Sequence, residues 1–122
     1  PRERDLAAGR SIAGSSDAYL NLIHVEDAAR AVVTAAAPGT VTRRTYNVSD
    51  GHPPTIGDYM ALVAGHLGLT RPRFEGGPGR GKRVRNDRVV HELGLRLTYP
   101  SYREGLGPAA SRSSRTQIPH EQ

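Results

Sequence analysis

The first group of residues that could do chemistry is an acidic turn beside a histidine, formed by His24, Glu26 and Asp27. On an extended backbone His24 and Glu26 share one face, and an imidazole beside a carboxylate occurs in metal sites and in acid–base catalysts. A metal site needs a third ligand, and none of the other four histidines is spaced to supply it. We therefore predict no metal site here and a structural role for His24.

The second group is the basic segment 71–103. It holds nine Arg or Lys residues against three acids, which accounts for the net charge of +5, and Lys82 is the only lysine. Guanidinium groups bind phosphate and carboxylate, so this segment could meet nucleic acid or an anionic group of a small substrate. A solvated face is the simpler interpretation, and an aromatic content of 5% leaves few rings for stacking on bases. Nucleic acid is therefore the less favoured partner.

The third group is the glycine-rich stretch Gly76 to Lys82, which fits the first seven positions of a phosphate-binding P-loop. Arg83 stands where that motif needs a Ser or Thr to reach magnesium, and no apolar strand leads into the loop. We therefore predict no nucleoside triphosphate site.

Composition limits the class of protein. The 122 residues suffice for one domain, but 36% hydrophobic residues with 14 Gly and 9 Pro suggest a piece of something larger, as does the start at Pro1. The absence of cysteine excludes disulfides, thiolate metal sites and a cysteine nucleophile. No apolar run approaches the roughly 18 to 20 residues of a membrane span and no signal-peptide pattern is present, so we predict a cytoplasmic protein with no membrane partner.

The first half of the sequence alternates between helix and strand patterns. We expect the last turns of a helix over 1–8, a strand over 19–25 and a helix from Glu26 to the stop at Pro38-Gly39. A second strand is expected over 45–48, ended by a polar turn. Strand, helix and strand together predict a crossover in a parallel sheet.

Helix caps organise the second half. Thr55 with Asp58 predicts a helix start, followed by four apolar positions on one face, and Gly68 is the expected end; the four are Ile56, Met60, Val63 and Leu67. Residues 71–75 are expected to be extended and 76–81 to form a loop. Further helices are predicted from Asn86 to Gly94 and from a capping box at Ser101 and Glu104. The tail after residue 106 has little to bury and is predicted to be disordered.

Four stretches follow one another along the chain: 21–31 (NLIHVEDAARA), 45–51 (TYNVSDG), 82–86 with 92–94 (KRVRN and ELG), and 99–106 (YPSYREGL). In this order they resemble the C-terminal part of the extended short-chain dehydrogenase/reductase family, the NAD-dependent epimerases and dehydratases. The resemblance covers roughly residues 9 to 107. It implies an α/β fold in which 1–51 are the end of a Rossmann-type domain, with its last crossover helix and strand. Residues 52–106 would form a small α/β substrate-binding lobe, and 107–122 a disordered tail.

The family's cofactor half is absent from this sequence. The family binds the dinucleotide at a glycine-rich turn between its first strand and helix, and no such turn precedes Asp17. Its catalytic base is a tyrosine four residues before a lysine, whereas the residue four before Lys82 is Pro78. We therefore assign no catalytic, cofactor-binding or metal-binding residue, and expect the chain alone to be inactive and to bind neither NAD nor NADP.

The resemblance points to four substrate-binding residues: Asn21, Arg80, Lys82 and Arg83. Nucleotide-sugar members of the family commonly carry an arginine in the frame where this chain has Leu20, and that arginine binds the substrate's diphosphate. Arg80 is a candidate replacement. Because the usual cation is missing, a sugar-like substrate and a smaller carbonyl compound both remain open.

Two hypotheses follow from these features. In the first, the chain is the C-terminal substrate-binding fragment of an NAD(P)-dependent epimerase, dehydratase or reductase that acts by hydride transfer, and its partner is the missing N-terminal Rossmann half. In the second, it is a non-catalytic binding or regulatory module that uses the Arg-rich segment 71–103. The first predicts exposed apolar surface on the isolated chain, and the second a cooperative, independently folded unit.

Overall fold

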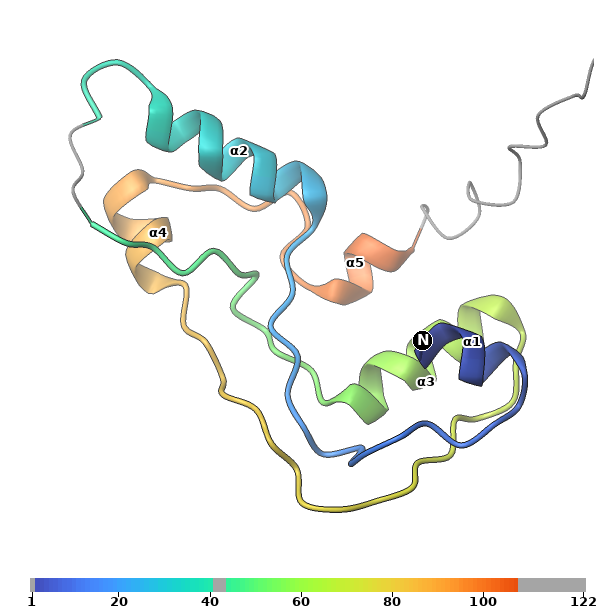
Figure 1. The fold of residues 1–122 in the computed structure, drawn as a ribbon. Helices are drawn as coiled ribbons and strands as arrows, with labels where there is room; N and C mark the ends of the chain where they lie inside the picture. Colours follow the sequence, from blue (N-terminus) through green and yellow to red (C-terminus); the bar gives the residue numbers. More distant parts are fainter. Residues whose placement is uncertain (1, 41–43, 108–122) are drawn as a thin grey trace, which may run out of the picture.

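The computed structural model describes residues 2–40 and 44–107, and helices joined by long extended segments make up this part of the chain (Figure 1). The helices are α1 (Arg2–Ala7), α2 (Val25–Ala36), α3 (Ile56–Leu67), α4 (Asp87–Leu93) and α5 (Tyr102–Leu106). Figure 1 shows α2 and α4 together at one end of the molecule and α1 and α3 at the other. The extended segments run between these two ends.

Each end has its own small core. Leu6 of α1 and Ile12 pack against the buried face of α3, whose inward residues are Ile56, Met60 and Ala64. At the other end Ala31 of α2, Val89 of α4 and Leu95 form a second cluster. Ile12 and Val89 are fully buried, so each core is anchored by a β-branched side chain. Two small cores in place of one large core agree with the low hydrophobic content of the sequence.

The predicted parallel sheet is not observed among the described residues. Segments 19–24 and 44–48 are extended but form no strand, and Val25, the last residue of the first predicted strand, already belongs to α2. The isolated bridges are Ile12 with Phe74, in parallel, and Tyr19 with Thr55, antiparallel. The Asp50 amide donates to Leu22 O at 2.7 Å, so the first segment contacts the turn that follows the second segment. The backbone of 16–22 is hydrogen-bonded instead to residues 50–57, for example from Leu20 N to Pro54 O at 2.9 Å and from Ile56 N to Ala18 O at 2.8 Å. The neighbour of the first segment is therefore not the second predicted strand.

The helix after His24 forms where the sequence predicts it, with one change at its start. His24 is the N-cap, since its Nδ1 accepts a hydrogen bond from the Glu26 amide at 3.2 Å. Helix α2 therefore begins at Val25, one residue before the acidic pair that was expected to open it. It ends at Ala36, just before Pro38.

The prediction for α3 is confirmed at both ends. Thr55 Oγ1 accepts from the Asp58 amide at 3.1 Å, and Gly68 takes a left-handed conformation with φ of 65°. One predicted inward residue is wrong, because Leu67 is 54% exposed and Ala64 is buried in its place. The buried stripe of α3 ends with Ala64, so the last turn projects beyond the core.

The last two helices also form, but Asn86 is not a side-chain cap. Asn86 precedes α4, and its Nδ2 donates to Ser49 O at 2.9 Å instead of its own side chain accepting from the helix. Ser101 caps α5 by accepting from the Arg103 amide at 3.2 Å and also donates to the Glu104 carboxylate. Residues 2–7 are helical as expected, whereas 108–122 of the predicted disordered tail lie outside the described residues.

None of the helices in 2–40 and 44–107 has both the length and the apolar character that a membrane crossing requires.

Candidate functional site

The structure brings Asn21 to the basic loop that the sequence singled out. Asn21 Nδ2 donates to Lys82 O at 2.7 Å, and its Oδ1 accepts from the Val84 amide at 2.8 Å. One side-chain amide thus satisfies a carbonyl and an amide two residues apart, as a neighbouring strand would. Both ends of the amide are in use, so the observed role of Asn21 is to hold residues 82–84 in place.

The loop approaches Tyr19 closely because residue 81 is glycine. Gly81 has φ of 144°, and a Cβ there would lie 2.9 Å from both the backbone N and O of Tyr19. Arg83 then places its guanidinium carbon 5.4 Å from the centre of the Tyr19 ring, within the range of a cation–π contact. Arg80 and Lys82 are exposed. Of the four predicted substrate residues, Asn21, Lys82 and Arg83 therefore lie together beside Tyr19, and their part in binding stays a prediction.

Arg83 also borders a hollow of about 420 Å³, which we call the loop hollow. Two segments of the chain line it: Gly51 and Pro53 belong to one, and Arg83, Val84, Arg85, Asn86 and Asp87 belong to the other. Gly51 is required at this wall because it has φ of 80° and a Cβ there would lie 2.7 Å from Asn86 Oδ1. Arg83 and Arg85 are the two cationic residues of this lining.

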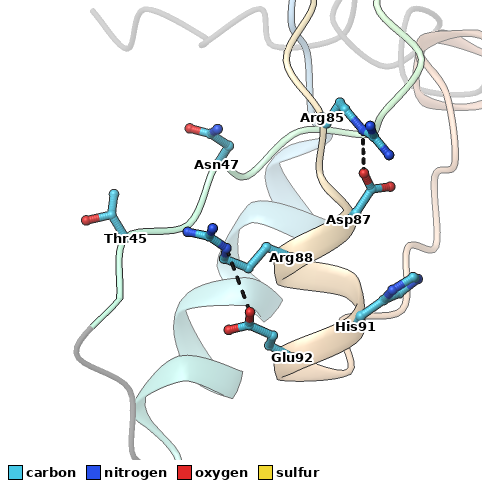
Figure 2. Close-up of a pocket in the computed structure, with 7 residues that line it drawn as sticks. All are labelled: Thr45, Asn47, Arg85, Asp87, Arg88, His91 and Glu92. Carbon is cyan, nitrogen blue, oxygen red and sulfur yellow. Dashed lines mark hydrogen bonds and ion pairs between the residues drawn. The ribbon is translucent and has the colours of Figure 1, made fainter.

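A second hollow, of about 490 Å³, lies on the other side of Arg85 and is drawn in Figure 2; we call it the α4 hollow. It is lined by Thr45, Asn47, Arg85, Asp87, Arg88, His91 and Glu92. Figure 2 shows the arginines each drawn to an acid, with Arg85 Nε 2.6 Å from Asp87 Oδ2 and Arg88 Nε 3.7 Å from Glu92 Oε1. The two hollows share Arg85 and Asp87, so they form one polar surface along α4.

Most residues of the α4 hollow were missed from the sequence. The available signal was the helical spacing of Asp87, Arg88, His91 and Glu92, which places four polar side chains on one side of α4. The arginines are highly exposed, with 87% of the Arg85 side chain and 60% of the Arg88 side chain accessible. Their pairs with acids are therefore weak and exchangeable, which suits a surface that binds an anion reversibly.

Asp27 has a structural role. It is fully buried, its Oδ1 accepts from Arg30 Nη1 at 2.7 Å and the Thr98 amide at 2.9 Å, and its Oδ2 accepts from the Tyr99 amide at 2.8 Å. Burial acts to raise the pKa of Asp27, but the Thr98 and Tyr99 amides and the Arg30 charge outweigh it, so the pKa is lowered. Asp27 therefore joins α2 to residues 98–99 as a carboxylate.

His24 also helps to attach α2 to residues 98–99, and we call this attachment the Asp27 joint. Its ring stacks on Tyr99 with 3.6 Å between the ring centres and 24° between the planes. Since Nδ1 accepts the hydrogen bond that caps α2, the proton of the neutral ring is assigned to Nε2. The predicted structural role of His24 is therefore confirmed by its contacts.

Asp50 is a second buried carboxyl with a different environment. It is 3% exposed, and one oxygen accepts from the His52 amide at 2.8 Å. Burial raises the pKa of Asp50, and the His52 amide only partly offsets this. His52 itself uses Nδ1 to contact Asp50 O at 3.1 Å and Pro100 O at 2.9 Å, which ties this turn to the start of α5. No local sequence pattern singles out Asp50.

Two further possibilities raised by the sequence have simple outcomes. Within the described ranges no three His, Asp or Glu residues gather closely enough to hold a metal ion. The P-loop-like stretch is followed by non-helical residues, because α4 begins only at Asp87. A P-loop needs a helix directly after its lysine to present amides to phosphate, so the geometry of that motif is not formed.

No protein-family model matches the sequence, and no curated protein matches it either. Solved structures do. A functionally unknown conserved protein from Silicibacter pomeroyi is 33% identical, with a TM-score of 0.64 over 87% of this chain and 43% of that one. The dTDP-glucose 4,6-dehydratase of Bacillus anthracis, in complex with NAD, is 15% identical with a TM-score of 0.71, over 93% of this chain and 37% of that one.

A short-chain dehydrogenase/reductase superfamily protein from Agrobacterium tumefaciens with bound NAD is also similar, at 19% identity and a TM-score of 0.64 over 91% of this chain and 37% of that one. The chain thus spans less than half the length of each of these three proteins. The two likenesses below 20% identity concern the fold alone. The described part of this chain is similar in fold to a portion of Rossmann-like short-chain dehydrogenase/reductase structures.

Proposed function

We propose that this chain is the substrate-binding, C-terminal portion of a longer NAD(P)-dependent epimerase, dehydratase or reductase of the extended short-chain dehydrogenase/reductase family. The whole enzyme would transfer a hydride between the nicotinamide and a sugar-like or small carbonyl substrate. The fold likeness to two NAD-bound proteins supports this assignment, as does the order of the four sequence stretches quoted above.

The observation that carries the proposal is an exposed apolar face on α2. Val25, Val32 and Val33 are 75%, 69% and 70% exposed, while Asp27 and Ala31 on the opposite side are buried against residues 89–99. A helix that is apolar on two sides is typical of a position between two layers of a protein. Contiguous exposed apolar side chains mark an interaction surface, so we assign this face to the Rossmann half of the enzyme.

The described residues do not fit the dinucleotide. No glycine-rich turn here leads directly into a helix, and α4 begins with an acid, Asp87, which would repel a pyrophosphate. The residue four before Lys82 is Pro78, so the catalytic tyrosine–lysine pair of the family cannot form in this part of the chain. Cofactor binding and hydride transfer are therefore assigned to residues outside this chain.

The chain's own contribution is to bind the substrate. Arg83 and Arg85 border the loop hollow, and Asn21 fixes the backbone between them. Two guanidinium groups on a braced loop can bind a phosphate or carboxylate by charge-assisted hydrogen bonds. We therefore propose an anionic group on the substrate, with Arg83 and Arg85 as its ligands and Arg80 and Lys82 as exposed cations nearby.

The test is the coding sequence upstream of Pro1. We expect an in-frame segment with a glycine-rich turn after a strand and a tyrosine four residues before a lysine. The full gene product should then show NAD(P)-dependent activity. Arg83→Leu should raise the KM for substrate by roughly tenfold, because one charged hydrogen bond is lost. Glu75→Gln, at an exposed position outside the loop hollow, is the control and should leave KM unchanged.

The opposite result would favour the binding module. An initiating codon at the start of the chain, together with a sharp unfolding transition for the 122 residues alone, would remove the need for a covering domain. Nucleic-acid affinity that falls steeply with salt would then point to segment 71–103 as the binding surface. A rise in Tm of the 122-residue chain with NAD or NADPH would contradict the assignment of the dinucleotide to other residues.

A further inference from the structure

A small pocket lies apart from the arginine-lined hollows, where α5, α3, the start of α2 and the turn at residue 50 meet. Its volume is about 180 Å³. Ten residues from these elements line it: Leu22, Ile23, His24, Val25, Asp50, Tyr59, Ser101, Tyr102, Gly105 and Leu106. We call it the Asp50 pocket. Aliphatic and aromatic side chains make up most of its wall, with a few polar groups, which is the usual composition of a site for a small molecule.

The Asp50 carboxyl is the most unusual polar group of this wall. The residue is 97% buried, yet only one of its oxygens accepts a hydrogen bond, from the His52 amide, among the residues that the structure describes. No Arg or Lys of the described ranges forms an ion pair with it. The His52 amide compensates only part of the hydration that this carboxyl has lost, and a ligand that donates hydrogen bonds would supply more.

Two tyrosines give the Asp50 pocket an aromatic wall. Tyr59 of α3 and Tyr102 of α5 have ring centres 6.1 Å apart, with an angle of 53° between the planes. The faces of tyrosine rings are electron-rich and attract cations. A buried carboxyl beside two such rings is therefore complementary to positive charge, and this complementarity is the reverse of that of the loop hollow.

The remaining wall limits the size of the ligand. Gly105 leaves room beside His24, since a Cβ there would lie 3.3 Å from His24 Cδ2. The hydroxyl of Ser101 donates to Glu104 and accepts from the Arg103 amide, so its main hydrogen bonds are made within the chain. A cavity of about 150 Å³ holds one benzene ring, so the Asp50 pocket has room for one ring with a short substituent.

From these observations we propose that the Asp50 pocket binds a small organic cation, an ammonium or amidinium carried on a single ring, with Asp50 as its counter-ion. Tyr59 and Tyr102 would flank the cation, and Ile23 and Leu106 would contact the apolar body. The site uses none of the residues assigned to the anionic substrate, so it stands independently of the enzyme proposed above.

Calorimetric titration of the full gene product with benzylamine tests this site. Benzyl alcohol has nearly the same shape without the charge, and benzoate carries the opposite charge. We expect benzylamine to bind at least about tenfold more tightly than benzyl alcohol, because a hydrogen bond between charged partners exceeds a neutral one, and benzoate not to bind. Equal affinity for the amine and the alcohol, or no binding of the amine, would overturn the proposal.

Substitutions locate the binding. Asp50→Asn keeps an oxygen for the His52 amide and removes only the charge, and should weaken benzylamine binding by about tenfold or more. Tyr102→Leu, which leaves the turn at residue 50 intact, should weaken it about threefold or more through loss of one ring. The matched control Glu75→Gln removes an exposed carboxylate outside the pocket and should leave the affinity unchanged. Unchanged affinity in both pocket variants would place the cation elsewhere and refute the assignment.

Discussion

Asp27 and Asp50 are both buried carboxyls that follow extended segments, yet their surroundings shift their pKa values in opposite directions. Burial acts on both to raise the pKa. At Asp27 two backbone amides and the Arg30 guanidinium outweigh it, whereas at Asp50 the single His52 amide does not. Burial alone therefore does not tell whether a carboxylate is a stabilising joint or a group available to a ligand. The number of hydrogen-bond donors that contact its oxygens decides which of these two roles the carboxylate has.

The difference also separates architecture from chemistry in this protein. Asp27 is completely satisfied, and together with His24 it fixes α2 against residues 98–99. One oxygen of Asp50 accepts no hydrogen bond from the described residues, and Asp50 lines a pocket. The motif that stands out most in the sequence is thus structural, while the more available carboxyl lies in an inconspicuous turn.

The same substitution at the two positions should have opposite effects on stability. Asp27→Asn replaces one acceptor oxygen by an NH₂ group that faces a donor, and removes the charge that Arg30 contacts. We expect the free energy of unfolding of the full gene product to fall by roughly 2–4 kcal/mol, measured by urea denaturation. Glu26→Gln, at the exposed neighbouring position, is the control and should change it by less than about 0.5 kcal/mol. A small effect at Asp27 would show that the joint is not needed for stability.

His24→Ala tests the rest of the joint around Asp27. It removes the side-chain cap of α2 and the stacking on Tyr99, and should lower the free energy of unfolding by about 1–2 kcal/mol. His66→Ala is the matched control, because His66 is exposed near the end of α3. If the two histidine variants lose equal stability, the stacked arrangement of His24 contributes nothing of its own.

Asp50→Asn should have the smallest effect on stability and the opposite sign. The His52 amide keeps its acceptor, and the cost of a buried charge disappears, so stability at pH 7 should stay equal or rise by up to about 1 kcal/mol. A loss above about 1 kcal/mol at pH 7 would mean that the Asp50 charge has a partner and would end the contrast with Asp27.

The pH dependence sharpens the comparison. Because the pKa of Asp50 is raised in the folded protein, its contribution to stability is present below the ordinary value of 3.8 and is lost as pH rises through the raised value. The advantage of Asp50→Asn over the parent should therefore grow over that interval. For Asp27, whose pKa is lowered, the contribution is present above 3.8 and is lost as pH falls through the lowered value, so the defect of Asp27→Asn should shrink in acid.

The helices were well predicted from the sequence because their signals are local. Each signal acts within a few residues of its own position. Helix starts are set by side-chain hydrogen bonds at Thr55 and Ser101, and helix ends by left-handed glycines at Gly68 and Gly94. Asn86 was misread as a side-chain cap because its partner, Ser49 O, is distant in sequence. Leu67 was misplaced because the extent of the core beyond the third turn of α3 depends on what packs there.

The sheet and the pocket could not be predicted in the same way. Residues 19–25 and 45–48 have β-favouring side chains, but the backbone partners of the first segment lie in 50–57 and not in the second predicted strand, and the described residues form isolated bridges in place of a sheet. The Asp50 pocket is assembled from elements far apart in sequence, so no local spacing marks it.

What the sequence determined by itself is the placing of helix starts and stops, the basic character of segment 71–103 and the order of the stretches that resemble a known family. Tertiary structure decided which acids are satisfied and which are available, and that Asn21 holds the loop at 82–84 by its amide. The physical reason is the separation along the chain over which each interaction acts. Capping and helix propensity act between near neighbours in the chain, whereas burial, hydrogen-bond partners and pKa depend on residues that only folding brings together.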